Sequence, residues 1–382
     1  MAASSRSKVS GEFALLGRVR AAVERLGRGR GVVVGIGDDC AVVEAPGAAS
    51  GRRGARSASK RPRGRATAPL LVLTTDTMVE GVHWRSGWLT PRELGVRAFR
   101  AAVSDVAAMG ARPRYALLSL EIPSDGRGLD EDGALVLVRS LAVEARRCGA
   151  ALVGGNVSGG ARAGVTVTVV GEAAARPLLR GGARPGDLVF VTGSLGGAAA
   201  GWRALLARDE AGARRRGPAR VAAGAFRRPP VRIDFAAALA GAGLAHAMID
   251  VSDGLLQDLG HVAEESGVAI RVDETLVPVH RDAARDARAL DLALGGGEDY
   301  ELAFTAAPSK RAAIERLAAR LRTPVHVIGF AEGGRASVTD ANGVPFAVAA
   351  GFDHLRKDAG RRTKRPVSRR LKTRAARATR TR

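Results

Sequence analysis

The chain contains few cysteines and few aromatic residues. Cys40 and Cys148 are the only cysteines among 382 residues, so a disulfide framework is excluded and a reducing, cytoplasmic compartment is expected. Aromatic side chains make up 4% of the chain, so a hydrophobic core must consist mainly of alanine, valine and leucine. The composition therefore excludes a small secreted domain held together by disulfides.

Long apolar runs are also missing. The longest, such as 165–170 (VTVTVV) and 187–191 (DLVFV), have the length of a strand and fall far short of the roughly 20 residues of a membrane span. The N-terminal stretch MAASSRSKVSGEF lacks the apolar core of a secretory signal. We therefore expect no membrane segment, and the chain is long enough for two domains with cores of their own.

Positive charge is abundant, with a net charge of +22, but it is concentrated in two segments. The tail 356–382 carries 13 Lys or Arg residues and one Asp, and the insertion 51–65 carries seven Lys or Arg residues and no acid. The rest of the chain is therefore nearly neutral. Such basic low-complexity segments cannot form a core, so we expect both to be disordered. They lack the interleaved aromatic residues of a nucleic-acid module, so contact between the tail and nucleic acid is the less favoured alternative.

Strand-like and helix-like segments alternate along the rest of the chain, which indicates an α/β or α+β class. Residues 91–110 are predicted to form a helix, with Pro91 in its first turn and apolar residues at helical spacing. A loop rich in Gly, Pro and Arg around 173–186 separates two such patterns. The predicted parts are a flexible N-terminus (1–10), an N-terminal domain (11–173), a C-terminal α/β domain (174–355) and the tail (356–382).

The acidic residues that stand out follow strands or glycine turns. Asp38 and Asp39 follow the glycine turn of GIGDDCAVV, and Asp76 ends the strand LVLTTD. The others are Asp105, in the alanine-rich helix, and Asp250, Asp253, Glu298 and Asp299, in the second half. Singly, each is most simply a turn former or a helix cap. Together they are expected to converge on one rim of a sheet, where their mutual repulsion requires a cation.

Magnesium is the cation that suits such a rim, since it prefers hard oxygen ligands and bridges to the phosphates of a substrate. Thr74, Thr75 and Ser252 add neutral oxygens beside the acids. The glycine-rich segments 153–160 and 191–201 could hold phosphate through backbone N–H groups, although neither has Walker or dinucleotide-binding spacing.

Two further residues have both a functional and a simpler interpretation. Arg180, in the loop between the domains, could meet a phosphate or lie in solvent. His83 follows the Asp76 strand within seven residues, and Trp84 beside it offers a surface for stacking. A histidine in a surface turn is the alternative. None of the histidines pairs with a cysteine at zinc-ligand spacing.

Nine motifs occur in order between residues 11 and 355, and together they are specific. They are GEF, GIGDDCAVV, TTDTMVEGVHW, AVSDVAAMGARP, VGGN, RPGDLVFVTGSLGGAAAG, RPPVR, IDVSDGLLQDLGHV and GGEDYEL. In this set the chain resembles the thiamine-monophosphate kinase family, part of the superfamily of ATP-dependent enzymes that includes aminoimidazole ribonucleotide synthetase.

The resemblance implies a two-domain α/β fold whose N-terminal domains form a homodimer with ATP in the resulting cleft. It implies ATP-dependent phosphorylation of thiamine monophosphate to thiamine diphosphate with several Mg²⁺ ions. The implied metal ligands are Asp39, Thr74, Thr75, Asp76, Asp105, Asn156, Asp250 and Asp253. The implied nucleotide contacts are Gly155, Asn156, Arg180 and Ser252, and the implied substrate contacts are His83, Glu298 and Phe352. Within the first acidic pair, Asp39 is then the ligand and Asp38 shapes the turn.

One position departs from the family pattern. The usual Gly-Gly-Asp turn is here Gly154-Gly155-Asn156. The Asn156 amide oxygen can still bind Mg²⁺, but one negative charge is lost, so weaker binding of one ion is expected.

The implied chemistry needs no general base, and we assign none. Thiamine monophosphate is already anionic, so catalysis depends on positioning and on neutralising the repulsion between two polyanions. The alternatives are another ATP-dependent enzyme of the same superfamily, similar to aminoimidazole ribonucleotide synthetase, or a nucleic-acid-associated protein acting through its basic tail.

Overall fold

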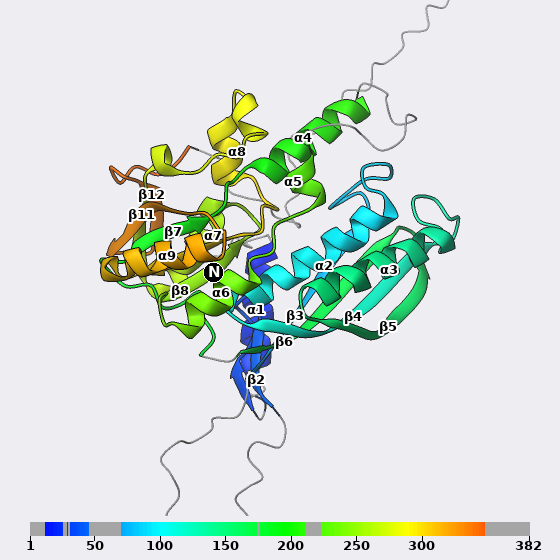
Figure 1. The fold of residues 1–382 in the computed structure, drawn as a ribbon, viewed down its shortest axis with the longest axis horizontal. Helices are drawn as coiled ribbons and strands as arrows, with labels where there is room; N and C mark the ends of the chain where they lie inside the picture. The colour runs from blue at the N-terminus through cyan, green and yellow to red at the C-terminus, as the bar shows by residue number, and fades with distance from the viewer. Residues whose placement is uncertain are drawn as a thin grey trace, which may run out of the picture.

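A computed structural model describes residues 12–25, 29, 31–45, 70–173, 176–210 and 223–347 (Figure 1). The predicted flexible N-terminus, the basic insertion 51–65, the basic tail and Phe352 lie outside the described residues. Within the described ranges, none of the helices combines the length and the apolar character needed to cross a membrane.

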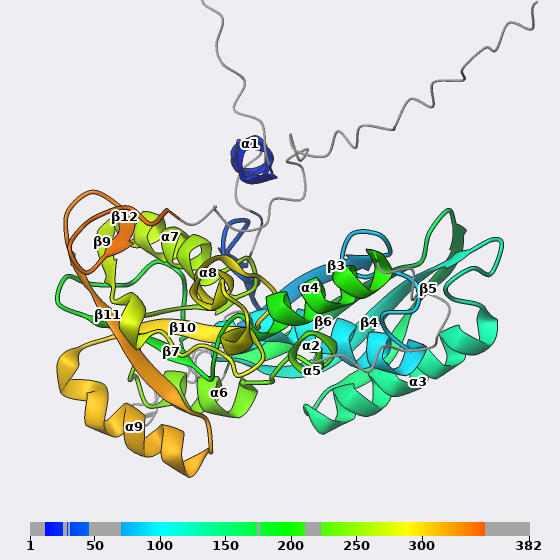
Figure 2. The same ribbon diagram turned by 90° about the horizontal axis from the view of Figure 1, so that it is seen from above.

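The first half of the chain forms a six-stranded sheet in the order β1-β2-β3-β6-β4-β5. Its strands are β1 (Val32–Val34), β2 (Ala41–Glu44), β3 (Leu70–Val79), β4 (Arg112–Pro123), β5 (Ala151–Gly160) and β6 (Gly164–Ala173). All neighbouring strands are antiparallel except β4 and β5, which are parallel. Helices α2 (Pro91–Ala108) and α3 (Glu131–Arg147) lie against one face of this sheet (Figures 1 and 2).

The second half forms another six-stranded sheet, in the order β12-β9-β11-β7-β10-β8. Its strands are β7 (Leu188–Thr192), β8 (Ala247–Val251), β9 (Val268–Val272), β10 (Glu301–Ala306), β11 (Val325–Gly333) and β12 (Ser337–Asp340). The α-helices of this half are α4 (Gly197–Glu210), α5 (Gly224–Arg227), α6 (Ile233–Gly241), α7 (Leu255–Ser266), α8 (Ala289–Gly295) and α9 (Arg311–Arg320). Short 3₁₀ turns are η3 (Glu274–Leu276), η4 (Ala283–Arg285) and η5 (Pro308–Lys310).

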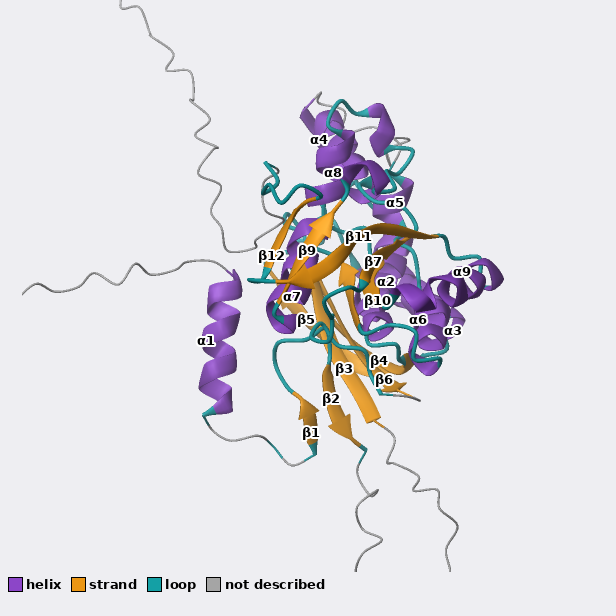
Figure 3. Ribbon diagram, turned by 90° about the vertical axis from the view of Figure 1, so that its left-hand side faces the viewer, coloured by secondary structure: helices purple, strands orange, loops and turns teal. Residues whose placement is uncertain are grey.

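Helix α1 (Glu12–Glu24) precedes both sheets and stands to one side of them (Figure 3). Its Arg20 forms an ion pair with Glu265 of α7, with 3.1 Å between guanidinium and carboxylate. Through Arg20 the N-terminal helix therefore contacts the second half of the chain, and the same side chain also lies against Gly37, between β1 and β2.

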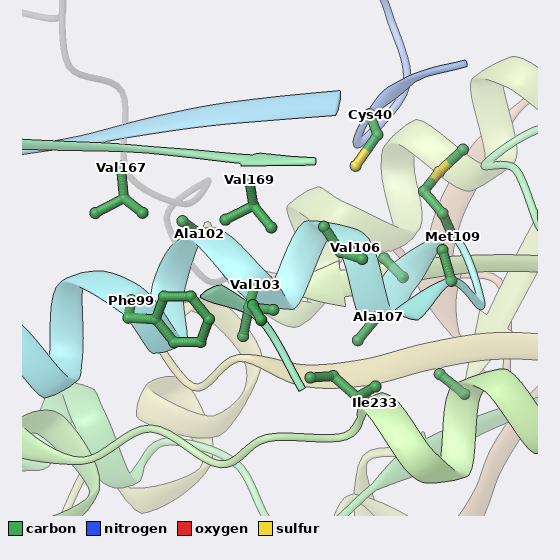
Figure 4. Packing of buried hydrophobic residues seen from close by; sticks show 14 of the residues in the cluster. Cys40, Phe99, Ala102, Val103, Val106, Ala107, Met109, Val167, Val169 and Ile233 are labelled. Atoms are coloured by element: carbon green, nitrogen blue, oxygen red, sulfur yellow. The ribbon is translucent and has the colours of Figure 1, made fainter. Parts of the chain in front are cut away.

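Helix α2 begins as the sequence predicts. Thr90 accepts a hydrogen bond from the backbone N–H of Glu93, whose carboxylate in turn accepts from the Thr90 backbone, and Pro91 occupies the first turn. One face of the helix, including Ala102 and Val106, lies towards Val167 and Val169 of β6, whereas Val103 points to the other side, towards Ile233 (Figure 4). The alanines of α2 keep the helix close to the sheet, because they add little side-chain thickness.

The opposite side of α2 packs against the second half of the chain. Ile233 and Phe235 of α6 and Met248 of β8 belong to the same buried cluster as the α2 residues. Helix α2 is therefore sandwiched between the two sheets. Because Asp105 is on α2 and Asp250 is near the end of β8, this packing brings carboxylates from the two halves together.

Candidate active site

Three carboxylates from three separate elements meet where the halves join. Asp39 precedes β2, Asp105 lies on α2 and Asp250 lies on β8, and one oxygen of each lies within 4.8 Å of the others. Asp39 and Asp250 are buried, whereas Asp105 is half-buried. The convergence predicted from the sequence is thus present for these three acids.

The pKa values of all three carboxyls are raised. Burial, which disfavours the charged form, is the main cause, and it lifts the pKa of Asp39 and that of Asp250 to about 6. The pKa of Asp105 is raised well above its usual value by burial and by the charges of Asp250 and Asp39. The cluster therefore carries its negative charges at a free-energy cost that a cation would offset.

The polar surroundings of the cluster fit a hard cation. Thr74 donates a hydrogen bond to Asp105 (2.5 Å), and Ser252 donates to Asp250 (3.3 Å). Oδ2 of Asp39 and Oδ2 of Asp250 are buried and have no hydrogen-bond partner among the residues that the structure describes. Orphaned carboxylate oxygens are costly unless something binds them, so these two atoms are suitable ligands for Mg²⁺.

Arg180 and Asp38 border the cluster. The Arg180 guanidinium donates to Oδ1 of Asp39 through two nitrogens, at 3.1 and 2.5 Å. Asp38 accepts hydrogen bonds from the backbone N–H groups of Asp39 (2.9 Å) and Arg180 (3.2 Å). The two neighbouring aspartates therefore differ: Asp39 belongs to the carboxylate cluster, while Asp38 holds the chain around it.

A cavity of about 370 Å³ opens beside the cluster, between the two halves of the chain. Its polar lining comes from Thr75, Asp76, Asp105, Ser252 and Asp253, with His83, Arg203 and Glu298 also in the wall. Its apolar and aromatic lining comes from Met78, Val82, Ala199, Trp202, Leu292 and Tyr300. The cavity can therefore receive a ligand that combines a phosphate with an organic group.

The predicted substrate contacts His83 and Glu298 both line this cavity. The Nδ1 of His83 accepts a hydrogen bond from the backbone N–H of Val79 (2.9 Å), which fixes the orientation of the ring. Glu298 has a backbone φ of 68°, unusual for a residue other than glycine. Its carboxylate is held at 2.6 Å by the fully buried guanidinium of Arg97 on α2. The third predicted contact, Phe352, lies outside the described residues.

Gly155 and Asn156, which were predicted to contact the nucleotide, do not lie beside the carboxylate cluster of their own chain. They are on β5, an outer strand, with β6 and β4 between it and β3, and Asn156 is exposed. A Cβ on Gly155 would overlap the carbonyl oxygen of Leu118, so only glycine fits there. Segment 153–160 is therefore a strand paired with β4 rather than the predicted phosphate-holding turn, and within one chain it is remote from the carboxylate cluster.

The second glycine segment, 191–201, binds a carboxylate side chain of the same chain. The backbone N–H groups of Gly196 (2.5 Å) and Ala198 (3.1 Å) donate to the buried carboxylate of Asp299. Asp299 thus turns away from the carboxylate cluster and caps the start of α4. The phosphate site proposed for this turn is filled by a side chain.

The hydroxyls of the two threonines on β3 also differ. The Thr74 hydroxyl donates to Asp105 (2.5 Å), whereas the Thr75 hydroxyl pairs with that of Thr168 on β6 (3.1 Å). Side chains alternate between the two faces of a strand, which explains why neighbours of the same type have different partners.

Three residues around the site, Arg97, Asp258 and Trp202, were not predicted from the sequence. Arg97 could have been noticed as a basic residue on an otherwise apolar helix face. Asp258, on α7, accepts from three consecutive backbone N–H groups of the loop that carries Ser252 and Asp253. Trp202 lines the cavity, whereas Trp84, expected to offer a stacking surface, is buried in the core of the first half.

The fold and the site define a two-domain α/β protein with an acidic crevice between its halves. Two family models match the chain: "AIR synthase related protein, N-terminal domain" over residues 37–173, and "AIR synthase related protein, C-terminal domain" over residues 184–341. The expected fold class is thereby confirmed.

Individual relatives define the family more closely. The chain is 30% identical over 341 residues to thiamine-monophosphate kinase of Haemophilus influenzae, covering 85% of this chain and 93% of the relative. It is 34% identical over 325 residues to that of Salmonella typhimurium, covering 84% and 90%. A solved structure described as "AaThiL complexed with AMPPCP and TMP" has a TM-score of 0.73 and 29% identity, covering 92% of this chain and all of that one. The chain belongs to the thiamine-monophosphate kinase family, and it is an enzyme of the phosphotransferase class.

Proposed function

We propose that this protein transfers the γ-phosphate of ATP to thiamine monophosphate, forming thiamine diphosphate and ADP. The observation that carries the proposal is the cavity between the halves, whose wall combines carboxylates with apolar and aromatic residues. Family membership supports it, since relatives that match over most of their length carry the name thiamine-monophosphate kinase.

The carboxylate cluster has the donor set that Mg²⁺ requires. We assign Asp39, Asp105 and Asp250 as the central ligands, because their oxygens are within 4.8 Å of one another and two further oxygens are orphaned. The remaining proposed ligands are Thr74, Thr75, Asp76, Asp253 and Asn156. Bound Mg²⁺ would neutralise the phosphate charges that otherwise repel each other.

The residues of the chain then bind and orient the two substrates. Arg180 is paired with Asp39, and a cation bound to Asp39 would make the guanidinium available to a phosphate. Ser252 borders the cavity beside Asp253. His83, Glu298 and Phe352 are the residues that we propose to contact thiamine monophosphate. The attacking phosphate oxygen is already anionic, so no residue is needed as a general base.

We further propose that the enzyme is a homodimer formed through the first sheet. Apolar side chains are exposed on β4, on the face opposite to the buried Leu118 and Leu120, where Tyr115 is 55% and Leu117 42% exposed. An apolar surface of this kind indicates an interface. The nucleotide contacts proposed for Gly155 and Asn156 would then come from the β5 of a second copy, because β5 is remote from the cluster of its own chain. We also propose a cytoplasmic location, because the proposed reaction uses ATP.

The reaction is tested directly with purified protein, ATP, Mg²⁺ and thiamine monophosphate, by separating the thiamine phosphates chromatographically. Thiamine diphosphate and ADP should form in equal amounts, and only with Mg²⁺ present. Asp76→Asn should lose most of the turnover while remaining folded. Failure to form thiamine diphosphate, or ADP release that does not depend on thiamine monophosphate, would contradict the proposal and favour another reaction of the superfamily.

A further inference from the structure

Trp202 occupies a distinctive place in the cavity. It lies on α4, in the second half of the chain, and is half-buried in the cavity wall. The first half of the chain contributes Met78 and Val82 to the same wall. An indole in this position offers a broad, flat, apolar surface to whatever enters.

The indole of Trp202 is held by two other aromatic rings. The ring of Trp88 meets it at 85° with 4.8 Å between centroids, and the ring of Phe226 at 71° with 5.7 Å. Trp88 is itself buried, and its Nε1 donates a hydrogen bond to Asp209 (3.0 Å). Edge-to-face contacts of this kind fix the orientation of a ring, so little conformational entropy is lost when a ligand packs against it.

The charged groups in the wall are compatible with a cationic ring. Glu298 lines the same cavity as Trp202, and its carboxylate is paired with the buried Arg97 at 2.6 Å. The guanidinium of Arg203, also in the wall, is paired with Asp286 at 3.3 Å. The face of the indole itself attracts a flat cation, because its quadrupole places negative charge there.

We propose that Trp202 is a specificity-determining residue whose indole stacks on the cationic aromatic ring system of the substrate, with the substrate phosphate directed to the carboxylate cluster. This inference rests on the proposed function, because the substrate there combines a thiazolium and an aminopyrimidine with a phosphate. It adds to that function a stacking surface supplied by α4.

Steady-state kinetics test the stacking. Trp202→Leu should raise the KM for thiamine monophosphate by about 10-fold or more, as expected when an aromatic stack is lost. Trp202→Phe keeps a ring and should raise this KM by about threefold or less. The KM for ATP should change by less than about twofold in both variants, because stacking involves only the second substrate.

Leu206→Ala is the matched control. Leu206 packs against the same aromatic cluster but does not line the cavity, so its removal loosens the packing without removing the stacking surface. Its KM for thiamine monophosphate should stay near that of the wild type. An equal rise of this KM in Leu206→Ala and in Trp202→Leu would show that Trp202 acts only through packing and would overturn the proposal.

Tryptophan fluorescence separates this inference from the proposed reaction. Trp84 and Trp88 are buried, so quenching by added thiamine monophosphate should come from Trp202 and disappear in Trp202→Phe. If thiamine diphosphate forms but the quenching persists in Trp202→Phe and the KM is unchanged in Trp202→Leu, stacking is wrong and the reaction stands. If no product forms but quenching depends on Trp202, the reaction is wrong and stacking stands. Absence of both product and quenching overturns both.

Discussion

At the scale of single residues, adjacent aspartates have different tasks. Asp38 organises the turn through two backbone hydrogen bonds, whereas Asp39 meets Asp105 and Asp250 across the junction of the two halves. Asp299, which follows the glycine run together with Glu298, caps α4 instead of joining the cluster. The partners that the fold brings within reach of each carboxylate, and not the residue type, therefore decide which carboxylates form a cation site.

Asp105→Asn should abolish most of the activity yet stabilise the metal-free protein. Removing one of three mutually repelling carboxylates should raise the free energy of unfolding by about 1 kcal/mol, a rise in Tm of roughly 2–4 °C. Calorimetry in the presence of a chelator, near neutral pH, measures this gain. The gain should shrink as the pH is lowered, because protonation of the cluster removes the repulsion between its carboxylates. A variant less stable than the wild type without metal would contradict self-repulsion in the cluster.

The stability of the metal-free protein should fall as the pH rises through the titration range of the cluster. The folded-state pKa of Asp39 and of Asp250 is raised from 3.8 to about 6. Between these values the folded state retains protons that the unfolded state has released, so this contribution to stability is present at about pH 4 and lost above about pH 6.

Mg²⁺ competes with those protons, so the rise in Tm on adding Mg²⁺ should be larger at about pH 7.5 than at about pH 5. Thermal unfolding with Mg²⁺ and with chelator at the two pH values measures the difference. Asp250→Asn serves as the control and should show a smaller difference. An effect of Mg²⁺ that is independent of pH would show that the cluster is not the binding site.

At the scale of elements, loops around the site are held by carboxylates from neighbouring helices. Asp258 of α7 accepts from the backbone N–H groups of Ser252 (3.1 Å), Asp253 (3.2 Å) and Gly254 (3.1 Å). A single side chain thus determines the shape of the loop between β8 and α7. Arg97 does the same for Glu298 from the opposite half of the chain.

Asp258→Ala should lower the free energy of unfolding by about 2–3 kcal/mol, because three backbone donors lose their acceptor. It should also lower the turnover, since Ser252 and Asp253 are no longer held in place. Denaturant unfolding and the kinase assay measure the two effects. Asp258→Asn keeps a carbonyl acceptor and should be affected less. Glu264→Ala, at an exposed position of the same helix, should change stability by less than about 0.5 kcal/mol.

At the scale of the whole molecule, the cavity exists because two halves of the chain close around α2. Neither half contains the site by itself, since Asp105 comes from one half and Asp250 from the other. We propose that the exposed apolar side chains of β4 and β5 pack against a second copy of the chain. The site proposed for the nucleotide is then shared between chains.

Leu117→Glu should convert the proposed dimer into a monomer, because a buried charge on each chain would oppose association. Leu135→Glu is the matched control: Leu135 is 69% exposed on α3, which covers the other face of the sheet. Light scattering after size-exclusion chromatography should show a dimer for the wild type and for Leu135→Glu. A monomeric wild type would contradict the proposed interface.

Much of the local structure follows from the sequence. The predicted helix 91–110 is α2, because Pro91, the Thr90–Glu93 cap and the apolar spacing all favour the same helix. Segment 153–160 was predicted to be a turn from its glycines and is a strand. Pairing with β4 outweighs the weak strand propensity of glycine there. The position of Trp202 in the cavity could not be predicted, because it depends on how α4 packs against α5 and α8.

The sequence by itself determined the family, the fold class and the acidic residues that gather at the junction, since these are carried by motifs whose residues are close along the chain. Only the tertiary structure decided which oxygens lie within 4.8 Å, which glycine turn is filled by Asp299 and which tryptophan borders the cavity. The physical reason is that these distances join residues far apart in the sequence. They depend on strand register and on the packing of α2 between two sheets, and local sequence pattern specifies neither.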